Sequence, residues 1–137
     1  MLRKNAKIEL LKRVPLFENC SKAELARIAA IADEVSLPAD RQLTQEGEPG
    51  REFVILVEGA AEVRRKGRVI NRLGDGDFLG EIALVADVPR TATVTTTWPC
   101  RILLLTDRAF RSLMRESPSL QTKVLSALAA RVPPEFQ

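Results

Sequence analysis

The chain has 137 residues, of which 45% are hydrophobic and 28% charged, so we expect one compact domain of ordinary composition and no second substantial one. Lys and Arg number 21 against 18 Asp and Glu, and a surplus of three charges is too mild to indicate a nucleic-acid binder. The sequence has no histidine, the commonest catalytic base and metal ligand, so metalloenzymes and His-dependent hydrolases are poor candidates.

The N-terminal part of the chain is predicted to be helical. Apolar residues at helical spacing between Asn5 and Val14 predict a short helix, which Pro15 ends. Ser21 and Glu24 have the spacing of a capping box, and the apolar stripe behind them predicts a second helix. We therefore expect residues 1–32 to form N-terminal helices, whose many cationic side chains make a solvated face.

Residues 33–106 have the texture of short strands. β-Branched runs separated by Gly, Pro and Asp predict strands at 34–37, 41–44, 53–57, 60–65, 68–73, 91–97 and 100–105. A turn is expected at Lys66-Gly67. Short strands at such regular spacing favour an antiparallel β-roll, sandwich or barrel over a parallel sheet.

Helical spacing returns after the strands. Thr106 or Asp107 can cap one helix, and Ser117-Pro118 can begin a last helix that ends near Pro133-Pro134. We assign residues 107–132 to these C-terminal helices. The predicted fold is mainly β with flanking α-helices, an antiparallel β-roll or jelly roll that occupies residues 1–137 as a single domain.

Several other features favour a plain soluble protein. Cys20 and Cys100 form no CxxC pair, which favours reduced thiols in the cytoplasm. The longest stretch without Asp, Glu, Lys or Arg, residues 91–100, is far shorter than the roughly 20 residues of a membrane span, and no secretory signal is present. Trp98 is expected to be a core residue or a packing cover. The residues from Gly74 to Asp77 predict a turn rather than a calcium loop.

The segment from Gly74 to Ala92 carries the chemistry. Glu81 begins a short apolar turn whose N–H groups suit an anion, and small residues at Gly80 and Ala83 allow a ligand to approach the backbone. Arg90 follows, and its guanidinium can bind phosphate oxygens in bidentate fashion, beside the Thr91 hydroxyl.

Each of these residues also has a plain structural interpretation. Arg90 alone is a surface arginine bonded to a carboxylate such as Asp87, and Glu81 alone is an acid favoured in a first helical turn. Taken together they predict an anion receptor with one acidic residue. A carboxylate beside a phosphate needs a hydroxyl donor, and a ribose 2′-OH is one.

The segment Phe78–Val94 resembles the phosphate-binding cassette of cyclic nucleotide-binding domains, the family of cAMP-dependent protein kinase regulatory subunits, cyclic nucleotide-gated channels and catabolite activator protein. Upstream, residues 46–50 are similar to the family's glycine turn before the strand at 53–59. The resemblance covers nearly the whole chain, and Gly-Glu-x-Ala-Leu followed by Pro-Arg-Thr-Ala is a highly specific pattern. It implies a bacterial-type, stand-alone member with its cassette at residues 78–92.

The resemblance also implies a role for each site residue. Glu81 would accept a hydrogen bond from the ribose 2′-OH, and Arg90 would pair with the cyclic phosphate. The ribose would lie against Leu79 and Gly80. The phosphate cradle would be completed by Thr91 and by the backbone amides of Ile82, Ala83 and Ala92. The purine would pack on Val63 and Val69, under a lid formed by Leu125 or Leu128 of the last helix.

The implied function is that of a regulatory sensor of a 3′,5′-cyclic nucleotide, with output through movement of the C-terminal helices to a protein partner or a second copy. We expect cAMP ahead of cGMP, although Thr91 permits cGMP without requiring it. No catalytic set, metal site, other cofactor, membrane segment or DNA-binding domain is expected. The alternatives are a degenerate interaction module of the same fold and a weak nucleic-acid-associated regulator.

Overall fold

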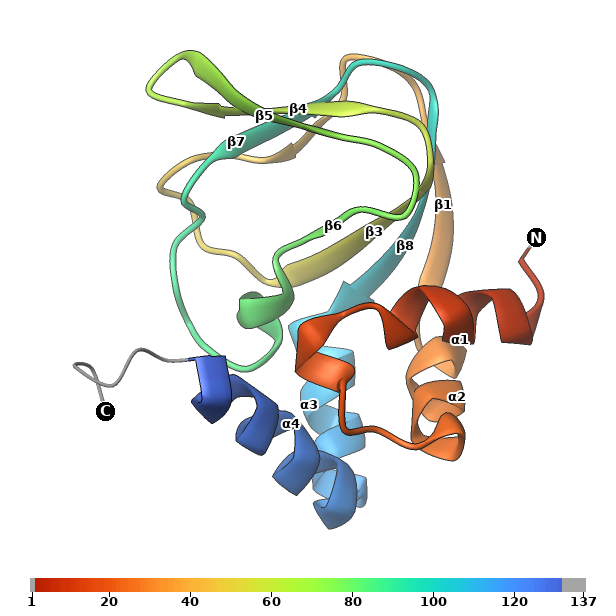
Figure 1. Ribbon diagram of the computed structural model, residues 1–137. Helices are drawn as coiled ribbons and strands as arrows, with labels where there is room; N and C mark the ends of the chain where they lie inside the picture. The colour runs from red at the N-terminus through yellow and green to blue at the C-terminus, as the bar shows by residue number, and fades with distance from the viewer. Residues whose placement is uncertain (1, 132–137) are drawn as a thin grey trace.

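The computed structural model describes residues 2–131 and places two antiparallel sheets above a group of helices (Figure 1). The helical elements are α1 (Lys4–Lys12), η1 (Pro15–Phe17), α2 (Lys22–Ala30), η2 (Glu81–Leu84), α3 (Asp107–Glu116) and α4 (Pro118–Arg131). The strands are β1 (Asp33–Leu37), β2 (Gln42–Thr44), β3 (Glu52–Glu58), β4 (Ala61–Arg65), β5 (Arg68–Leu73), β6 (Phe78–Leu79), β7 (Thr93–Thr96) and β8 (Cys100–Thr106). The predicted β-roll with flanking helices is confirmed.

The strands form two sheets of four, in the orders β1-β8-β3-β6 and β2-β7-β4-β5, and every pairing is antiparallel. The predicted turn at Lys66-Gly67 is a two-residue hairpin loop with both residues at positive φ, 52° and 78°, as a type I′ turn requires. The two-residue strand β6 was not predicted, because it is too short to show a pattern. It leads directly from the first sheet into η2.

The predicted caps form. Ser21 Oγ accepts from the N–H of Glu24 at 3.1 Å, and Glu24 Oε1 accepts from the N–H of Ser21 at 2.8 Å, which completes the capping box. Thr106, rather than Asp107, caps α3. The 3-10 turn η1 was not predicted, since Pro15 was taken only as the end of a helix and it also begins the next turn.

Aromatic rings connect the helices to the sheets in the main core. Phe17 of η1 packs against Phe53 of β3 with ring centroids 6.1 Å apart and against Phe110 of α3 at 5.5 Å. Phe53 in turn packs against Phe78 of β6 at 6.0 Å. Because Phe17, Phe53 and Phe110 are fully buried, η1 is fixed between the helices and the start of the cassette.

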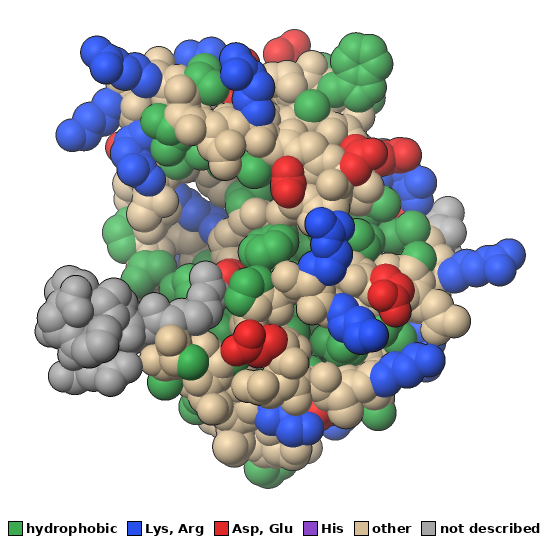
Figure 2. All heavy atoms as spheres, viewed as in Figure 1, with side chains coloured by type: hydrophobic (Ala, Val, Ile, Leu, Met, Phe, Trp, Pro, Cys, Tyr) green, Lys and Arg blue, Asp and Glu red, His purple; other side chains and the backbone are tan. Residues whose placement is uncertain are grey.

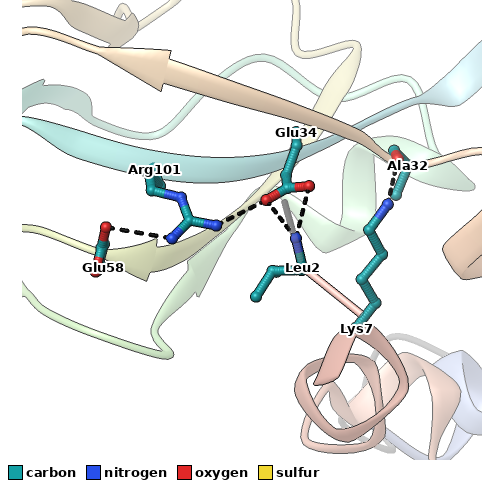
Figure 3. A network of polar contacts seen from close by, with 6 residues as sticks. All are labelled: Leu2, Lys7, Ala32, Glu34, Glu58 and Arg101. Carbon is teal, nitrogen blue, oxygen red and sulfur yellow. Dashed lines mark hydrogen bonds and ion pairs between the residues drawn. The ribbon is translucent and has the colours of Figure 1, made fainter. Parts of the chain in front are cut away.

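A polar network fixes the N-terminal end of the chain on the edge strand β1 (Figure 3). The carboxylate of Glu34 accepts from the N–H of Leu2 at 2.9 and 3.0 Å and from Arg101 Nη2 at 2.8 Å. Arg101 also reaches Glu58 at 3.4 Å. The hydrogen bond from Arg101 lowers the pKa of Glu34, so this carboxylate is ionised at neutral pH.

Of the remaining sequence predictions, the turn at residues 74–77 is confirmed and the packing of Trp98 is wrong. Cys20 and Cys100 are unpaired, and burial raises the pKa of the Cys20 thiol to about 11. Asp77 donates its N–H to Gly74 O at 3.1 Å, so the predicted turn is confirmed. Trp98, however, is 67% exposed, because it lies in the β7–β8 connection beyond the ends of both sheets, and the prediction of a packed ring was wrong. No helix within residues 2–131 has the length and apolarity to cross a membrane.

Glu24 also holds the last helix in place. Its carboxylate accepts from Lys123 Nζ at 2.6 Å and from Ser119 Oγ at 3.2 Å, so one side chain caps α2 and binds α4. The hydrogen bonds from Lys123 and from the N–H of Ser21 lower the pKa of Glu24 to about 2, from an ordinary value of 4.5.

Glu24→Gln is therefore expected to lower the free energy of unfolding at neutral pH. Because the folded-state pKa is depressed, the stabilisation by the carboxylate is fully present above about pH 4.5 and is lost as the pH falls towards 2. Urea unfolding of both proteins between pH 7 and pH 2 measures the difference in their free energies of unfolding. A difference in unfolding free energy that stays constant over this range would contradict the assignment.

Candidate functional site

A cavity of about 630 Å³ lies between the sheet β2-β7-β4-β5 and the segment that runs from β6 through η2 to β7. Figure 2 shows this side of the molecule hollowed below the upper strands. The volume lies within the roughly 300–1,000 Å³ usual for small-molecule sites. Its lining residues are Thr44, Val63, Asn71, Leu73, Phe78, Leu79, Gly80, Glu81, Ile82, Ala83, Val88, Pro89, Arg90, Thr91, Ala92 and Val94.

Nine of the ten site residues predicted from the sequence line this one cavity, and Val69 is the exception. A shift of register in the β4–β5 pair explains it, since Val63 is opposite Asn71 but Arg64 is opposite Val69. Ile70 is the extra residue of a β-bulge. Because of the bulge, Val69 lies with Arg64 on the face of the sheet that is turned away from the cavity. Asn71 and Leu73 of β5 thus line the cavity beside Val63 of β4. The sequence contains no pattern that predicts the bulge.

The guanidinium of Arg90 lies between two glycines. A Cβ added to Gly50 would lie 2.8 Å from Arg90 Nε, and one added to Gly80 would clash with Arg90 Nη1 and lie 2.6 Å from Glu52 O. Gly80 also has a φ of +80°, which side chains rarely adopt. Only glycine at both positions leaves room for the arginine in this place.

The backbone of Arg90 is held as firmly as its side chain. Its N–H donates to Glu48 O and its C=O accepts from the N–H of Gly47, both at 2.8 Å. Pro49 and Pro89 form an isolated β-bridge beside this pair. The glycine turn at residues 46–50, which the sequence singled out, therefore anchors the far end of the cassette.

The charge of Arg90 has no ion-pair partner among the residues that the structure describes. Its Nη2 donates to the carbonyl oxygen of Glu52, and among residues 2–131 it forms no ion pair with a carboxylate, so the expected alternative of a bond to Asp87 is wrong. Burial lowers the pKa of this guanidinium, and the nearby charge of Glu52 opposes that effect. An arginine stays protonated even so. The cavity thus has a half-buried cation that an anionic ligand can neutralise.

Glu81 faces the same cavity but is tied to the helices. Its side chain is 6% exposed, and its Oε2 accepts from the N–H of Leu16 in η1 at 3.3 Å. Arg111 of α3 donates through Nε to Leu84 O at 3.3 Å at the other end of η2. The predicted short turn after Gly80 is confirmed as a 3-10 turn, and it is hydrogen-bonded to η1 and to α3.

The three residues whose backbone amides were predicted as donors, Ile82, Ala83 and Ala92, all line the cavity. The N–H of Ala83 donates to Gly80 O at 3.1 Å within the turn, whereas we find no hydrogen bond from the N–H of Ile82 or Ala92 to any group in residues 2–131. Thr44 Oγ1 donates to Ala92 O at 2.9 Å and accepts from the N–H of Val94 at 3.1 Å, which fixes this part of the wall. Of the three amides, that of Ala83 is therefore already used within the turn.

Among the side chains that the structure describes, the two predicted lid residues of the last helix do not line the cavity. Leu125 is 45% exposed and Leu128 packs partly buried against the main core, and neither lines the cavity. The described part of the site is thus an apolar slot with a cation, a carboxylate and backbone amides along its wall, and neither Leu125 nor Leu128 covers it. This arrangement suits an anionic group joined to a hydroxylated ring and a flat apolar base.

Comparison with known proteins agrees with this geometry. The sequence model of the cyclic nucleotide-binding domain matches residues 34–117. The chain belongs to this family.

Its relatives include the "cAMP-dependent protein kinase regulatory subunit" of Mycosarcoma maydis, 38% identical over 77% of this chain and 22% of the relative. The N-terminal domain of a transcriptional regulator from Streptomyces coelicolor A3(2) superposes with a TM-score of 0.80 at 30% identity, covering 89% of this chain and 91% of that one. A structure described as "cAMP bound PfPKA-R" has a TM-score of 0.68 at 26% identity, covering 92% of this chain and 47% of that one. The chain spans about a quarter of the length of the curated relatives that it matches first.

Gly80→Ala is expected to destabilise the domain more than Gly67→Ala. Both glycines have φ near +80°, but an added Cβ meets nothing within 4 Å at Gly67 and meets Arg90 and Glu52 at Gly80. Left-handed backbone strain alone is worth about 1–2 kcal/mol, so Gly67→Ala measures that part and the excess for Gly80→Ala measures the displaced arginine. Urea unfolding compares the two, and equal losses would contradict the packing of Arg90 against Gly80.

Proposed function

We propose that this domain binds a 3′,5′-cyclic nucleotide, cAMP ahead of cGMP, as a regulatory sensor. The observation that carries the proposal is Arg90, a half-buried cation fixed between Gly50 and Gly80 at the wall of an apolar cavity and without a carboxylate partner in the described chain. A cyclic phosphate supplies one negative charge at this point, and a bidentate guanidinium contact is the strong form of that interaction.

The other cavity residues take the remaining parts of the nucleotide. Glu81 accepts from the ribose 2′-OH, while Leu79 and Gly80 contact the ribose. Thr91 and the amides of Ile82, Ala83 and Ala92 surround the phosphate. The purine lies against Val63, with Leu73 and Val94 in the place first given to Val69. The apolar walls and the single anion site support a ligand with one charged end.

The preference for cAMP rests on the relatives. Those named for cAMP include several protein kinase regulatory subunits, and one structural neighbour is described as cAMP-bound. Thr91, whose carbonyl accepts from Arg65 Nε at 2.9 Å, still leaves its hydroxyl for a guanine amino group. We therefore place cGMP second.

The structure offers a route from the cavity to the last helix. Glu81 binds the N–H of Leu16, Leu16 is fully buried, and η1 packs against α4. When the carboxylate engages a ribose, its bond to η1 is altered and α4 can shift, which brings the exposed apolar side chain of Leu125 towards the base. We propose this movement of the C-terminal helices as the output, read by a protein partner or a second copy.

The proposed role is non-enzymatic, and the two unpaired cysteines support a cytoplasmic location. The alternative of a degenerate interaction module is disfavoured, because the cavity, Arg90 and Glu81 are all in place.

Isothermal titration with cAMP and with cGMP tests the proposal. We expect one saturable site, tighter for cAMP. Arg90→Ala should weaken cAMP binding by about 2–4 kcal/mol, a factor of roughly 30–1,000 in Kd, because the phosphate is left buried without its cation. The exposed Arg108→Ala is the matched control and should leave the affinity unchanged.

Absence of heat with either nucleotide would refute the proposed function. An unchanged affinity of the Arg90→Ala protein would refute the role of this residue, provided that circular dichroism shows the variant to be folded. Tighter binding of cGMP than of cAMP would reverse the proposed preference while leaving the site in place.

A further inference from the structure

The β4–β5 hairpin concentrates the positive charge of the chain. Residues 61–73 contain five Lys and Arg against Glu62 alone, a net charge of +4. The chain as a whole carries +3, with 21 cations and 18 anions, so the other residues hold 16 cations and 17 anions and are close to neutral. Figure 2 shows Lys and Arg side chains gathered over the hairpin at the upper left.

These cations face solvent, and most lack an acidic partner. Arg64 pairs with Glu62 at 3.0 Å and Arg65 Nε binds Thr91 O, but the other three form no ion pair within the described chain. All five side chains are exposed. Those without an ion pair are Lys66, Arg68 and Arg72. The carboxylate of Glu46 also reaches the hairpin, where its Oε1 accepts from the N–H of Lys66 at 3.0 Å.

The hairpin ends in an open sheet edge. β5 is the last strand of the sheet β2-β7-β4-β5 and pairs only with β4. It is six residues long, and Ile70, the bulge residue in its middle, is 48% exposed. Such an edge offers main-chain groups to an added strand, and cationic side chains along it prevent two copies of the same edge from pairing. The same charges favour a strand of opposite sign.

From this combination we infer that the β5 edge is a docking surface for an extended acidic segment of a partner protein, which adds to the sheet as a further strand. Carboxylates of the partner would face Arg72 on the outer face of the sheet and Arg68 on the other face, and an apolar side chain would cover Ile70. Residues 61–73 contain no aromatic side chain on which single-stranded bases could stack, and one exposed isoleucine is too little apolar surface for membrane insertion.

The surface is distinct from the nucleotide cavity but shares its wall. Val63, Asn71 and Leu73 line the cavity from the same two strands. By the strand register, Arg64 and Arg72 lie on the outer face of this hairpin, whereas Arg68 is opposite Arg65 on the face of Val63. Because Lys66, Arg68 and Arg72 are not among the residues that line the cavity, docking at β5 and occupancy of the cavity can be measured separately on one protein.

Fluorescence anisotropy with two labelled peptides of equal charge tests the inference. The first has five Glu-Thr repeats and can form a strand, whereas the second has five Glu-Pro repeats and lacks half of the N–H donors. We expect the Glu-Thr peptide to bind and the Glu-Pro peptide to bind at least about tenfold more weakly. Equal binding would show attraction by charge alone and would overturn strand addition, and so would no binding of either peptide.

Variants locate the site. Arg68→Glu with Arg72→Glu should weaken Glu-Thr peptide binding at least about tenfold, whereas Lys22→Glu with Arg108→Glu changes the net charge equally at exposed sites on α2 and α3 and should not. Arg68→Gln with Arg72→Gln serves if the reversed pair fails to fold by circular dichroism. Equal losses in the two charge-reversed pairs would overturn the location.

Other anionic partners are compared directly. A short DNA duplex and vesicles of phosphatidylserine and phosphatidylcholine are titrated under the same salt conditions. Tighter binding of either than of the Glu-Thr peptide would overturn the assignment to an acidic protein segment. Titration of cAMP into the Arg68 and Arg72 variants reports on the cavity independently, so a failure of nucleotide binding is not mistaken for a failure of docking.

Discussion

The site depends on a single placed charge, the guanidinium of Arg90 lying between Gly50 and Gly80. This placement requires glycine on both sides, a left-handed backbone at residue 80 and a carbonyl from β3 to receive one N–H. The turn at residues 46–50, the strand β3 and the cassette are brought together at this side chain. Burial there is unfavourable for a cation without an anion, and in the proposed function the cyclic phosphate would supply that anion.

Glu81 links that charge to the rest of the molecule. Its carboxylate lines the cavity and also accepts from the N–H of Leu16, so the cassette is joined to η1, and through η1 to the aromatic core and to α4. Glu24 of α2 also holds α4, through its ion pair with Lys123. Two contacts therefore hold α4. One is the ion pair of Lys123 with Glu24, and the other is the packing of η1, whose bond to Glu81 a ribose would alter. The exposed cations of β5 lie outside this path, at the free edge of the sheet.

The sequence was most informative where a local pattern determines a local structure. The capping box at Ser21 and Glu24 and the turn at Lys66-Gly67 predicted what the structure shows, and nine of the ten residues singled out for the site line one cavity. The sequence was silent where a feature depends on distant contacts. The bulge that displaces Val69 follows from strand pairing, and the exposure of Trp98 follows from where the two sheets end. The carbonyl partner of Arg90 lies 38 residues away, and no pattern of neighbouring residues encodes it.

The central claim is that the cyclic phosphate neutralises Arg90, and a crystal structure of the complex with cAMP tests it most directly. The account predicts phosphate oxygens at about 2.7–3.2 Å from the Arg90 guanidinium and the ribose 2′-OH at a similar distance from the Glu81 carboxylate. Nucleotide bound elsewhere, or in the cavity with its phosphate directed to solvent and away from Arg90, would contradict it.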